Sequence, residues 1–346
     1  MERKISKREA LVAVLLVSAL IIIIALCILI GADNGTDIEV HTAESYAWFD
    51  TYSTVRDYSG ESPEEFNKTF SEISELFDYY HTLFDIYNEY DGGPINLCTL
   101  NRLAGTGAVK VDKELIEFLE YSIEMYALTH GEVNIAMGAV LSVWHEYREA
   151  GTAIPPEDVL ISASEHCDIN KIIIDKENST VELADSEMSL DVGAIAKGYA
   201  TEKAAQMLKE RGKNGYVLDI GGNLRAVGTK ADGSPWRAGV RNPDFNGESY
   251  IHRFDIADSS AVTSGNYERY YTVNGVNYHH IIDKDTLMPS VHFASVTVLC
   301  ESSALADALS TALFNMTASE GKALVETLDG VSVIWVDLDG EITTSK

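Results

Sequence analysis

Cysteine is scarce in this chain of 346 residues, which contains four. After residue 31 only Cys98, Cys167 and Cys300 remain, and no two of them form a C-x-x-C pair. An odd and scattered set of thiols argues against a disulfide framework and against a cysteine-based zinc site. We therefore expect these cysteines to be buried free thiols.

Positive charge is scarce as well, because 26 lysines and arginines stand against 54 aspartates and glutamates. The net charge of −28 includes +2 from residues 1–31, which hold four basic and two acidic groups, so the remainder carries −30. Nucleic acid and anionic lipid bind through clustered Lys and Arg, and so acidic a surface repels both. A substrate that carries phosphates would need a bound cation to help hold it.

A linker rich in proline, serine or glycine is also absent from the part of the chain after residue 45. About 300 residues are enough to bury a sizeable core. We expect one large domain, or two closely packed lobes, over residues 46–346.

The N-terminus carries one long hydrophobic run. Residues 10–31 contain no charged side chain, and about 20 apolar residues suffice to cross a bilayer as a helix. The basic residues lie before the run, so the positive-inside bias places the N-terminus in the cytoplasm. We predict a cytoplasmic basic tail at 1–9, a transmembrane anchor at 10–31, a linker at 32–45, and an extracytoplasmic domain on the cell membrane at 46–346.

Two other interpretations of this run stay open. A cleaved secretory signal is one, although the run is longer than an ordinary signal core and no A-x-A-like site closes it. Lipid attachment at Cys27 is the other, although Leu26 stands where a small residue would be wanted. The uncleaved anchor is the preferred interpretation.

Hydrophobic periodicity predicts helices and a series of short strands. The helices are expected at 62–82, 112–131, 193–211, 302–316 and 319–328. The strands are expected at 171–175, 180–184, 216–220, 224–228, 236–241, 251–257, 268–273 and 294–300, with hairpin turns at 274–275 and 339–340. We predict the α+β class, with helices packed on largely antiparallel β-sheets and preceded by one transmembrane helix.

A carboxylate and two hydroxyls lie on the predicted helix at 302–316. Asp307 and Thr311 are four residues apart and therefore share one face, and Ser310 is adjacent. Hard oxygen ligands of this kind suit Mg²⁺. Taken alone the pair is a weak signal, since Asp and Thr one turn apart are most often found on a solvated helix face.

Three glycine-containing segments lie at the ends of predicted elements. Residues 190–200 lead into a helix, and backbone groups at such an entry can meet a phosphate or a metal. Their spacing matches neither the P-loop nor G-x-G-x-x-G. Residues 218–223 and 262–267 are strands that run into glycine. On pattern alone, a structural turn explains the first segment and a bulge explains each of the others.

His280 and Asp283 lie at the end of a predicted hairpin strand. Strand alternation places His280 and Ile282 on one face. His279, Ile281 and Asp283 then lie on the other. A histidine with a carboxylate nearby can accept a proton in catalysis. A hydrogen-bonded histidine at a strand end, without a catalytic role, explains the fragment equally well.

In their order along the chain, these segments resemble the ApbE family, the FAD:protein FMN transferases. The residues that carry the resemblance are LDVGAIAKGYA (190–200), LDIGGN (218–223), AVTSGNYER (261–269), HIID (280–283) and ADALSTALF (306–314). Earlier segments are similar as well, namely WFDTYSTV (48–55), FDIY (84–87) and THGEVNIAMG (129–138). The resemblance covers residues 46–346, and five ordered motifs are far more specific than any one of them.

The resemblance implies an enzyme that binds FAD with Mg²⁺, transfers the FMN part to a Thr or Ser hydroxyl of an acceptor protein, and releases AMP. The acceptors are expected to be extracytoplasmic proteins with an FMN-binding domain, components of electron-transfer chains. Two alternatives stay open. One is an FAD pyrophosphatase that gives FMN and AMP, and the other is a non-catalytic FAD-binding module.

The resemblance also implies roles for individual residues. The metal ligands are expected to be the backbone carbonyl of Ala194 with Asp307 and Thr311, and Ser310 is adjacent. His280 or Asp283 is expected to accept the proton of the acceptor hydroxyl. The FAD contacts are expected at Phe49, Tyr87, Glu132, Val133, Asn134, Asp191, Lys197, Thr263 and Ile281.

Two positions depart from the family pattern. Asn134 stands where the family usually has Asp, which bears on the FAD contact expected there. The family's HIIDP-x-T-G appears here with Lys284 in place of Pro and Leu287 in place of Gly. The second departure is expected to alter a turn and to leave the chemistry unchanged.

Overall fold

The computed structural model describes residues 39–243 and 248–345. The predicted tail, the anchor and Cys27 all lie outside the described residues. None of the helices within these two ranges combines the length and the apolar character that a membrane crossing requires.

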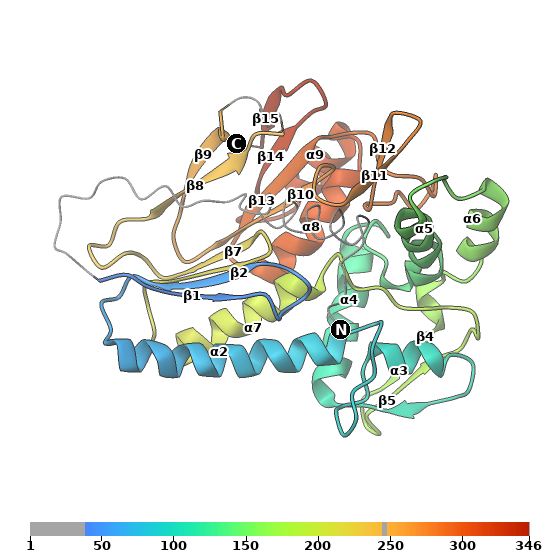
Figure 1. Ribbon diagram of the computed structural model, residues 1–346, viewed down its shortest axis with the longest axis horizontal. Helices are drawn as coiled ribbons and strands as arrows, with labels where there is room; N and C mark the ends of the chain where they lie inside the picture. Colours follow the sequence, from blue (N-terminus) through green and yellow to red (C-terminus); the bar gives the residue numbers. More distant parts are fainter. Residues whose placement is uncertain (1–38, 244–247, 346) are drawn as a thin grey trace, which may run out of the picture.

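An eight-stranded antiparallel sheet forms the centre of the molecule (Figure 1). In spatial order its strands are β1 (His41–Ser45), β2 (Ser53–Asp57), β6 (Tyr216–Ile220), β7 (Asn223–Val227), β10 (Ser260–Gly265), β13 (Ser295–Cys300), β14 (Ser332–Val336) and β15 (Ile342–Thr344). Each neighbouring pair is antiparallel. The predicted α+β class with antiparallel sheets is confirmed.

Strand β1 corrects the predicted start of the domain. A linker was expected at 32–45, and this expectation is wrong for its last five residues, since His41 pairs with Asp57 and Ser45 pairs with Ser53. The sequence HTAES is largely polar. This edge strand needs no apolar face, because backbone hydrogen bonds to β2 hold it in place. Ala43 packs against the core, and the His41 ring stacks on Phe66 of the core with the ring centroids 5.4 Å apart.

The two faces of the main sheet are covered differently. Helices α7 (Ala196–Glu210) and α8 (Ser303–Asn315) pack on one face, and the hairpin of β8 (Trp236–Arg241) and β9 (Tyr250–Ile256) covers the other. Side chains alternate accordingly along each strand. Leu218 belongs to the large core under the helices, whereas its neighbour Val217 packs in the cluster of Trp236.

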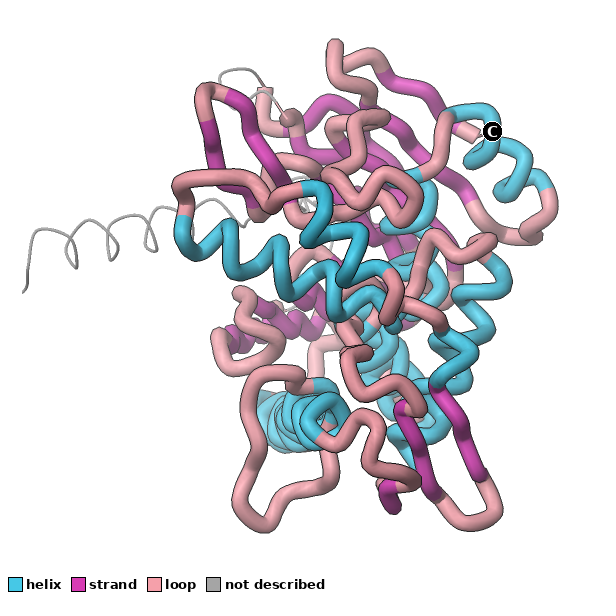
Figure 2. The backbone as a smooth tube through the Cα atoms, turned by 90° about the vertical axis from the view of Figure 1, so that its right-hand side faces the viewer, coloured by secondary structure: helices cyan, strands magenta, loops and turns pink. Residues whose placement is uncertain are grey.

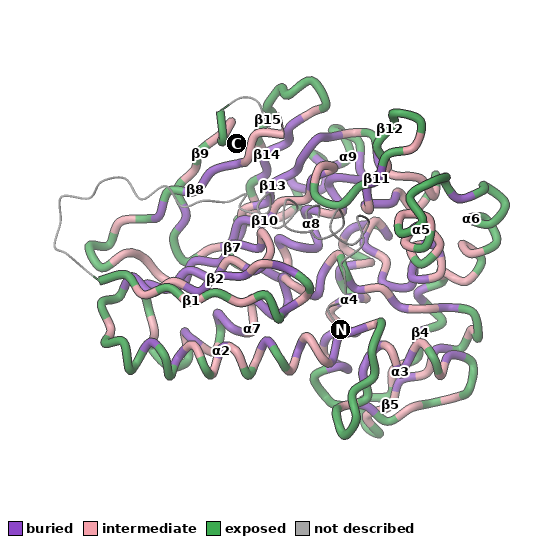
Figure 3. Tube along the Cα trace, in the orientation of Figure 1, coloured by how far each residue is buried: buried purple, intermediate pink, exposed green. Residues whose placement is uncertain are grey.

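Helix α2 (Pro63–Phe84) lies outside α7 and forms the edge of the molecule. Its N-cap is Ser62, whose hydroxyl accepts a hydrogen bond from the Glu65 amide, with Pro63 at the first helical position. Ile73 and Phe77 on its inner face are fully buried, while residues on its outer side are exposed (Figure 3). The helix predicted at 62–82 is confirmed.

A second group of elements stands beside the main sheet. The helices are α3 (Leu97–Arg102), α4 (Lys113–Leu128), α5 (Gly138–Ala150), α6 (Glu157–Ser164) and, after α8, α9 (Ala318–Glu326). Smaller sheets are formed by β3 (Val109–Lys110), β5 (Thr180–Leu183) and β4 (Ile172–Asp175), and by the hairpin of β11 (Tyr270–Val273) and β12 (Val276–His279). Seen from the side of α5 and α6, helices lie in front of the large sheet (Figure 2).

The entry into α7 differs from the prediction in a way that matters for the site. A helix was expected from residue 193, but the chain becomes helical only at Ala196, and residues 193–195 form turns. This turn brings α7 very close to α8. At Gly198 an added Cβ would lie 2.3 Å from the Asp307 Cβ and 2.5 Å from the Ser303 carbonyl oxygen.

We predict that Gly198→Ala destabilises the protein. Alanine has the better helix propensity by about 1 kcal/mol, but the methyl group would force α7 away from α8, an overpacking that costs about 1–3 kcal/mol. The control is Gly321→Ala in α9, where a Cβ would meet the flexible Leu313 side chain at 3.2 Å. Thermal unfolding should show a lower Tm for Gly198→Ala and an equal or higher Tm for Gly321→Ala. Equal Tm values for the two variants would contradict the close packing.

Candidate active site

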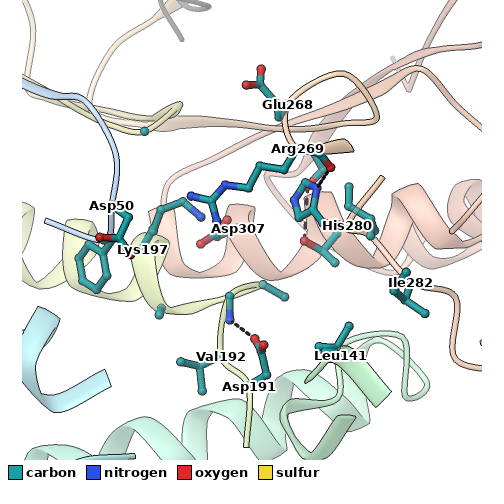
Figure 4. Close-up of a pocket in the computed structure, with 18 of the residues that line it drawn as sticks. Asp50, Leu141, Asp191, Val192, Lys197, Glu268, Arg269, His280, Ile282 and Asp307 are labelled. Carbon is teal, nitrogen blue, oxygen red and sulfur yellow. Dashed lines mark hydrogen bonds between the residues drawn. The ribbon is translucent and has the colours of Figure 1, made fainter. Parts of the chain in front are cut away.

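A cavity of about 430 Å³ opens where α7, α8 and the ends of several strands meet. Its walls come from segments far apart in the chain, including the loop after α2, helix α5, the turn before α7 and the hairpin β11–β12. A volume of this size is typical of a small-molecule site. Figure 4 shows the side chains that project into it.

The cavity brings together nearly all the residues that the sequence singled out. Those that line it are Phe49, Tyr87, Glu132, Val133, Asn134, Asp191, Ala194, Lys197, Thr263, His280, Ile281, Asp307 and Thr311. They are drawn from residues 49 to 311, so the fold alone makes them neighbours.

Asp283 and Ser310 are the two predicted site residues that do not line the cavity. The Asp283 carboxylate accepts hydrogen bonds from the amides of Asp285 and Thr286 and from the Thr286 hydroxyl, so it caps the altered turn. This corrects the candidacy of Asp283 as a base. The predicted alternation over 279–283 is wrong too, because β12 ends at His279 and both Ile281 and Ile282 are buried.

Asp307 is a buried carboxylate held by the backbone of α7. Its Oδ2 accepts a hydrogen bond from the Gly198 amide at 2.7 Å. Gly198 is the third residue of α7, so its amide is one of the four at a helix start that have no partner within the helix. The Asp307 side chain supplies that partner. Ala194 lies in the turn before the helix and lines the same cavity. Burial raises the pKa of Asp307, and Lys197 and the Gly198 amide oppose this shift.

The hydroxyl groups of α8 are held by strand β10. Ser264 contacts both the Ser310 hydroxyl at 2.9 Å and the Thr311 hydroxyl at 3.4 Å. Ser310 also donates to the Asp307 carbonyl at 2.9 Å. Ser310 thus lies behind the cavity wall, and Thr311 is the hydroxyl that reaches the cavity one turn after Asp307.

His280 and His279 are adjacent in the chain and have different surroundings. His279 is buried, and its ring bonds to the Ser290 carbonyl oxygen at 2.8 Å and to the Ile281 amide at 3.2 Å. The Nδ1 of His280 lies 3.2 Å from the Arg269 carbonyl oxygen. Since a carbonyl only accepts, Nδ1 carries the proton and Nε2 is left as the acceptor.

The charge state of His280 is set by its neighbours. Burial lowers its pKa to about 3, and the positive charges of Arg269, Lys197 and Arg148 act in the same direction. The imidazole is therefore neutral near pH 7, which is the form that can accept a proton.

Arg269 and Arg148 are site residues that the sequence reasoning missed. Arg269 and Lys197 extend towards the same part of the cavity, close to Asp307, and His280 lies beside Arg269 (Figure 4). A guanidinium nitrogen of Arg148, on α5, lies 2.6 Å from Nδ1 of His145, and Arg148 also lines the cavity. Although the protein is strongly acidic, its cavity carries clustered cations. Arg269 ends a segment quoted above, but a pattern does not tell where its side chain points.

Asp191 and Asn134 have defined partners in the cavity wall. The Asp191 carboxylate accepts from the Gly193 amide at 2.9 Å, and burial raises its pKa. The Asn134 side chain accepts from the Ala136 amide and donates to the Cys167 carbonyl at 3.0 Å. An ionised Asp could not make that second bond, so Asn at 134 suits the local structure of this chain.

The other departure from the family pattern also has a partner. The Lys284 ammonium lies 3.4 Å from the Glu132 carboxylate. This carboxylate is largely buried, and burial raises its pKa. Lys284 opposes that shift. Leu287 has a φ of 59°, a left-handed conformation that glycine adopts more readily.

Aromatic rings form the outer part of the site. The backbone amide of Phe49 donates a hydrogen bond to Nδ1 of His81 at 3.1 Å. The Phe49 ring packs edge-on against the His81 ring. The Tyr87 side chain is 60% exposed, and its ring lies 5.6 Å from that of His145. Flat, partly exposed rings at a cavity mouth can stack on a planar ring system.

A sequence model of the ApbE family matches residues 35–335. The chain belongs to the ApbE family. A curated FAD:protein FMN transferase from Treponema pallidum is 32% identical over 309 residues, which is 85% of this chain and 84% of the relative. The enzyme of the same name from Vibrio cholerae is 30% identical over 263 residues, covering 74% and 75% of the two chains.

Solved structures of ApbE proteins share the fold. The ApbE protein from Thermotoga maritima has a TM-score of 0.79 at 26% identity and covers 89% of this chain and 97% of its own. The flavinyl transferase ApbE from Pseudomonas stutzeri, in its apo form, has a TM-score of 0.74 at 25% identity and covers 89% and 94% of the two chains.

The oxygen atoms around Asp307 fit the Mg²⁺ that the ApbE resemblance implies. The donors would be a carboxylate, a hydroxyl and the carbonyl of Ala194 in the turn before α7, all of them hard ligands. In the described ranges no group of three or more His, Cys, Asp or Glu side chains is arranged to hold a metal. A site with one carboxylate suits Mg²⁺, which usually keeps several waters and shares its sphere with substrate phosphates.

The lowered pKa of His280 predicts an acid-sensitive contribution to stability. The ordinary pKa is 6.5 and the folded value is about 3, so between these values the unfolded chain binds a proton that the folded one does not. Stability therefore falls as pH drops through this window. From pH 7 to pH 5 the loss is about 2 kcal/mol at most.

His280→Gln should remove this contribution. Thermal unfolding at pH 7 and at pH 5 should show a smaller loss of Tm for the variant than for the unmodified protein. All other titrating groups are common to both proteins, so the difference isolates His280. The same loss in both proteins would show that the His280 pKa is not depressed.

Proposed function

We propose that this protein is an FAD:protein FMN transferase, which moves the FMN part of FAD onto a Thr or Ser hydroxyl of an acceptor protein and releases AMP. The relatives described above carry that name. The observation that carries the proposal is the neutral His280 beside two cations, Lys197 and Arg269, over the buried carboxylate of Asp307.

The cavity offers complementary groups along the length of an FAD molecule. Lys197 and Arg269 face the pyrophosphate, and Arg148 adds a third positive charge nearby. Phe49 and Tyr87 at the mouth cover a ring system. The cavity is also lined by Asp191, the segment 132–134, Thr263 and Ile281.

The reaction is a phosphoryl transfer with the acceptor hydroxyl as nucleophile. The hydroxyl oxygen forms a bond to the FMN-side phosphorus, and the bond from that phosphorus to the bridging oxygen breaks. AMP leaves with that oxygen, and the hydroxyl proton passes to Nε2 of His280. Lys197 and Arg269 hold the phosphates and stabilise the charge that builds up on them.

Mg²⁺, held by Asp307, Thr311 and the Ala194 carbonyl, would neutralise pyrophosphate charge when bound. This explains how so acidic a chain accommodates a dianionic substrate. Asp307 has its Oδ2 fixed by the Gly198 amide, so its Oδ1 is the atom free to face the cavity.

The test of the function uses the full chain in detergent with FAD, Mg²⁺ and an FMN-binding-domain acceptor. The expected result is an acceptor whose mass rises by one FMN less one water, with an equal amount of AMP. An acceptor with its Thr or Ser replaced by Ala is the control for the site of attachment, and Asp307→Ala should give no adduct. Free FMN without adduct would indicate a pyrophosphatase. Unchanged FAD would indicate a binding module.

The base assignment is tested by comparing His280→Gln with Asp283→Asn. We expect the first to lower kcat by about 10²–10⁴-fold with little change in FAD affinity, because a base acts on the barrier rather than on binding. Asp283→Asn should keep near-normal activity, since Asn can accept the same turn hydrogen bonds. Loss of FAD affinity in His280→Gln would make His280 a binding group instead.

The role of Arg269 is tested with Arg269→Gln. A charge-assisted hydrogen bond to phosphate is worth about 1.5–3 kcal/mol, so we expect the FAD dissociation constant to rise about 10–100-fold, measured by flavin fluorescence. The control is Arg237→Gln, which removes an arginine that is 62% exposed on β8. An unchanged dissociation constant for Arg269→Gln would remove Arg269 from the substrate site.

We also propose that residues 10–31 hold the enzyme on the outer face of the cell membrane. The support is the uncharged run with basic residues before it. The acceptors would then be exported or membrane-bound electron-transfer proteins, and FAD would have to be available on that side. Lipid attachment at Cys27 would change the tether and leave the chemistry as it is.

A further inference from the structure

Asn223 is a buried residue of the cavity wall to which no role has been given above. It follows the two-residue turn Gly221-Gly222 and begins β7, where it pairs with Ile220 and Val262. Both glycines have positive φ, 57° and 89°, as a type I′ turn requires. The turn places Asn223 at the end of β7 that faces α8, and its side chain is 1% exposed.

The two ends of the Asn223 amide have different surroundings. Its Nδ2 lies 3.5 Å from Oδ2 of Asp307, a distance at which it donates a weak hydrogen bond. Its Oδ1 is buried and has no hydrogen-bond partner among the described residues. A buried amide oxygen without a partner costs its desolvation free energy, so this one calls for an explanation.

We infer that Oδ1 of Asn223 is a further ligand of the divalent cation that Asp307 binds. This inference rests on the metal of the proposed function. An amide oxygen is a hard ligand of the kind that Mg²⁺ accepts, and it adds no charge to the site. The same side chain would then hold Asp307 through Nδ2 and the cation through Oδ1.

The geometry supports a shared coordination sphere. In an octahedral Mg²⁺ site each oxygen lies about 2.1 Å from the ion, so any two ligand oxygens are at most about 4.2 Å apart. The Asn223 amide already contacts Asp307, and its Oδ1 and Nδ2 are bonded to the same carbon. Together with Thr311 and the Ala194 carbonyl, these oxygens come from three different segments of the chain, namely β7, α8 and the turn before α7.

Asn315 provides a matched comparison within the same cavity. It is also a buried amide whose Oδ1 has no partner among the described residues, and its Nδ2 donates to the Ile282 carbonyl at 3.2 Å. It is eight residues after Asp307 on α8, which is about 12 Å along a helix. Removal of the Asn315 amide therefore tests for the general effect of losing a buried polar group.

The experiment measures Mn²⁺ binding to the full chain in detergent, without FAD, from the electron paramagnetic resonance signal of free Mn²⁺. Mn²⁺ takes the same oxygen ligands as Mg²⁺. We expect Asn223→Leu and Asn223→Ala to weaken binding at least about 10-fold. Asn223→Asp, which keeps an oxygen at the same place, should bind within a few-fold of the unmodified protein or more tightly. Asn315→Leu should bind normally, and Asp307→Ala should not bind.

Three outcomes would overturn the inference, and they are distinguishable. Normal binding by Asn223→Leu and Asn223→Ala, with no binding by Asp307→Ala, would leave the metal site in place without Asn223. Equal losses in Asn223→Leu and Asn223→Asp would show a structural role only. Normal binding by Asp307→Ala would show that the proposed metal site itself is wrong. Thermal unfolding in EDTA confirms that each variant compared is folded.

Discussion

The Gly198 amide and the Asp307 carboxylate meet at the seam between α7 and α8, and the rest of the site is arranged around this contact. The hydrogen bond is 2.7 Å long and buried. It requires a glycine, because any Cβ at position 198 would overlap Asp307. It also satisfies an amide that has no partner within the helix, because Gly198 belongs to the first turn of α7. One contact thereby fixes the carboxylate of α8 beside the start of α7, although the two segments are far apart in the chain.

Charge in this protein is divided between surface and cavity. The chain as a whole is strongly acidic, yet Lys197, Arg269 and Arg148 converge on the cavity. The same cations help to keep His280 neutral. An anionic substrate bound among them would offset their charge and make the imidazole a stronger base. In the proposed reaction, phosphate binding and proton acceptance would therefore be linked by electrostatics within one site.

Much of the fold was predictable, because helix caps, hydrophobic periodicity and turn residues are local signals. Ser62 and the Asn274-Gly275 turn, both of whose residues have positive φ, lie where their chemistry indicated. Strand β1 was not predicted, since backbone pairing holds it rather than an apolar face. Helices α3, α5 and α6 were missed as well. Each of them buries at most three residues, so no long apolar stripe marks it in the sequence.

The composition of the site was predictable to a similar degree. Ordered motifs identified His280, Asp307 and Thr311, and the fold brings them together. Side-chain direction was not available from the pattern. Asp283 was expected near the chemistry and instead caps a turn, because β12 ends before it and strand alternation stops there. Arg269 lay within a quoted motif, but its approach to Lys197 follows from the hairpin β11–β12 and not from local sequence.

We propose that the α7–α8 seam builds a site for one divalent cation. The most direct measurement is anomalous diffraction from crystals of the protein grown with Mn²⁺ and measured near the manganese absorption edge. We expect an anomalous peak at about 2.1–2.2 Å from Oδ1 of Asp307, within coordination distance of Thr311 and the Ala194 carbonyl oxygen. A peak at acidic surface residues alone, with none beside Asp307, would contradict it.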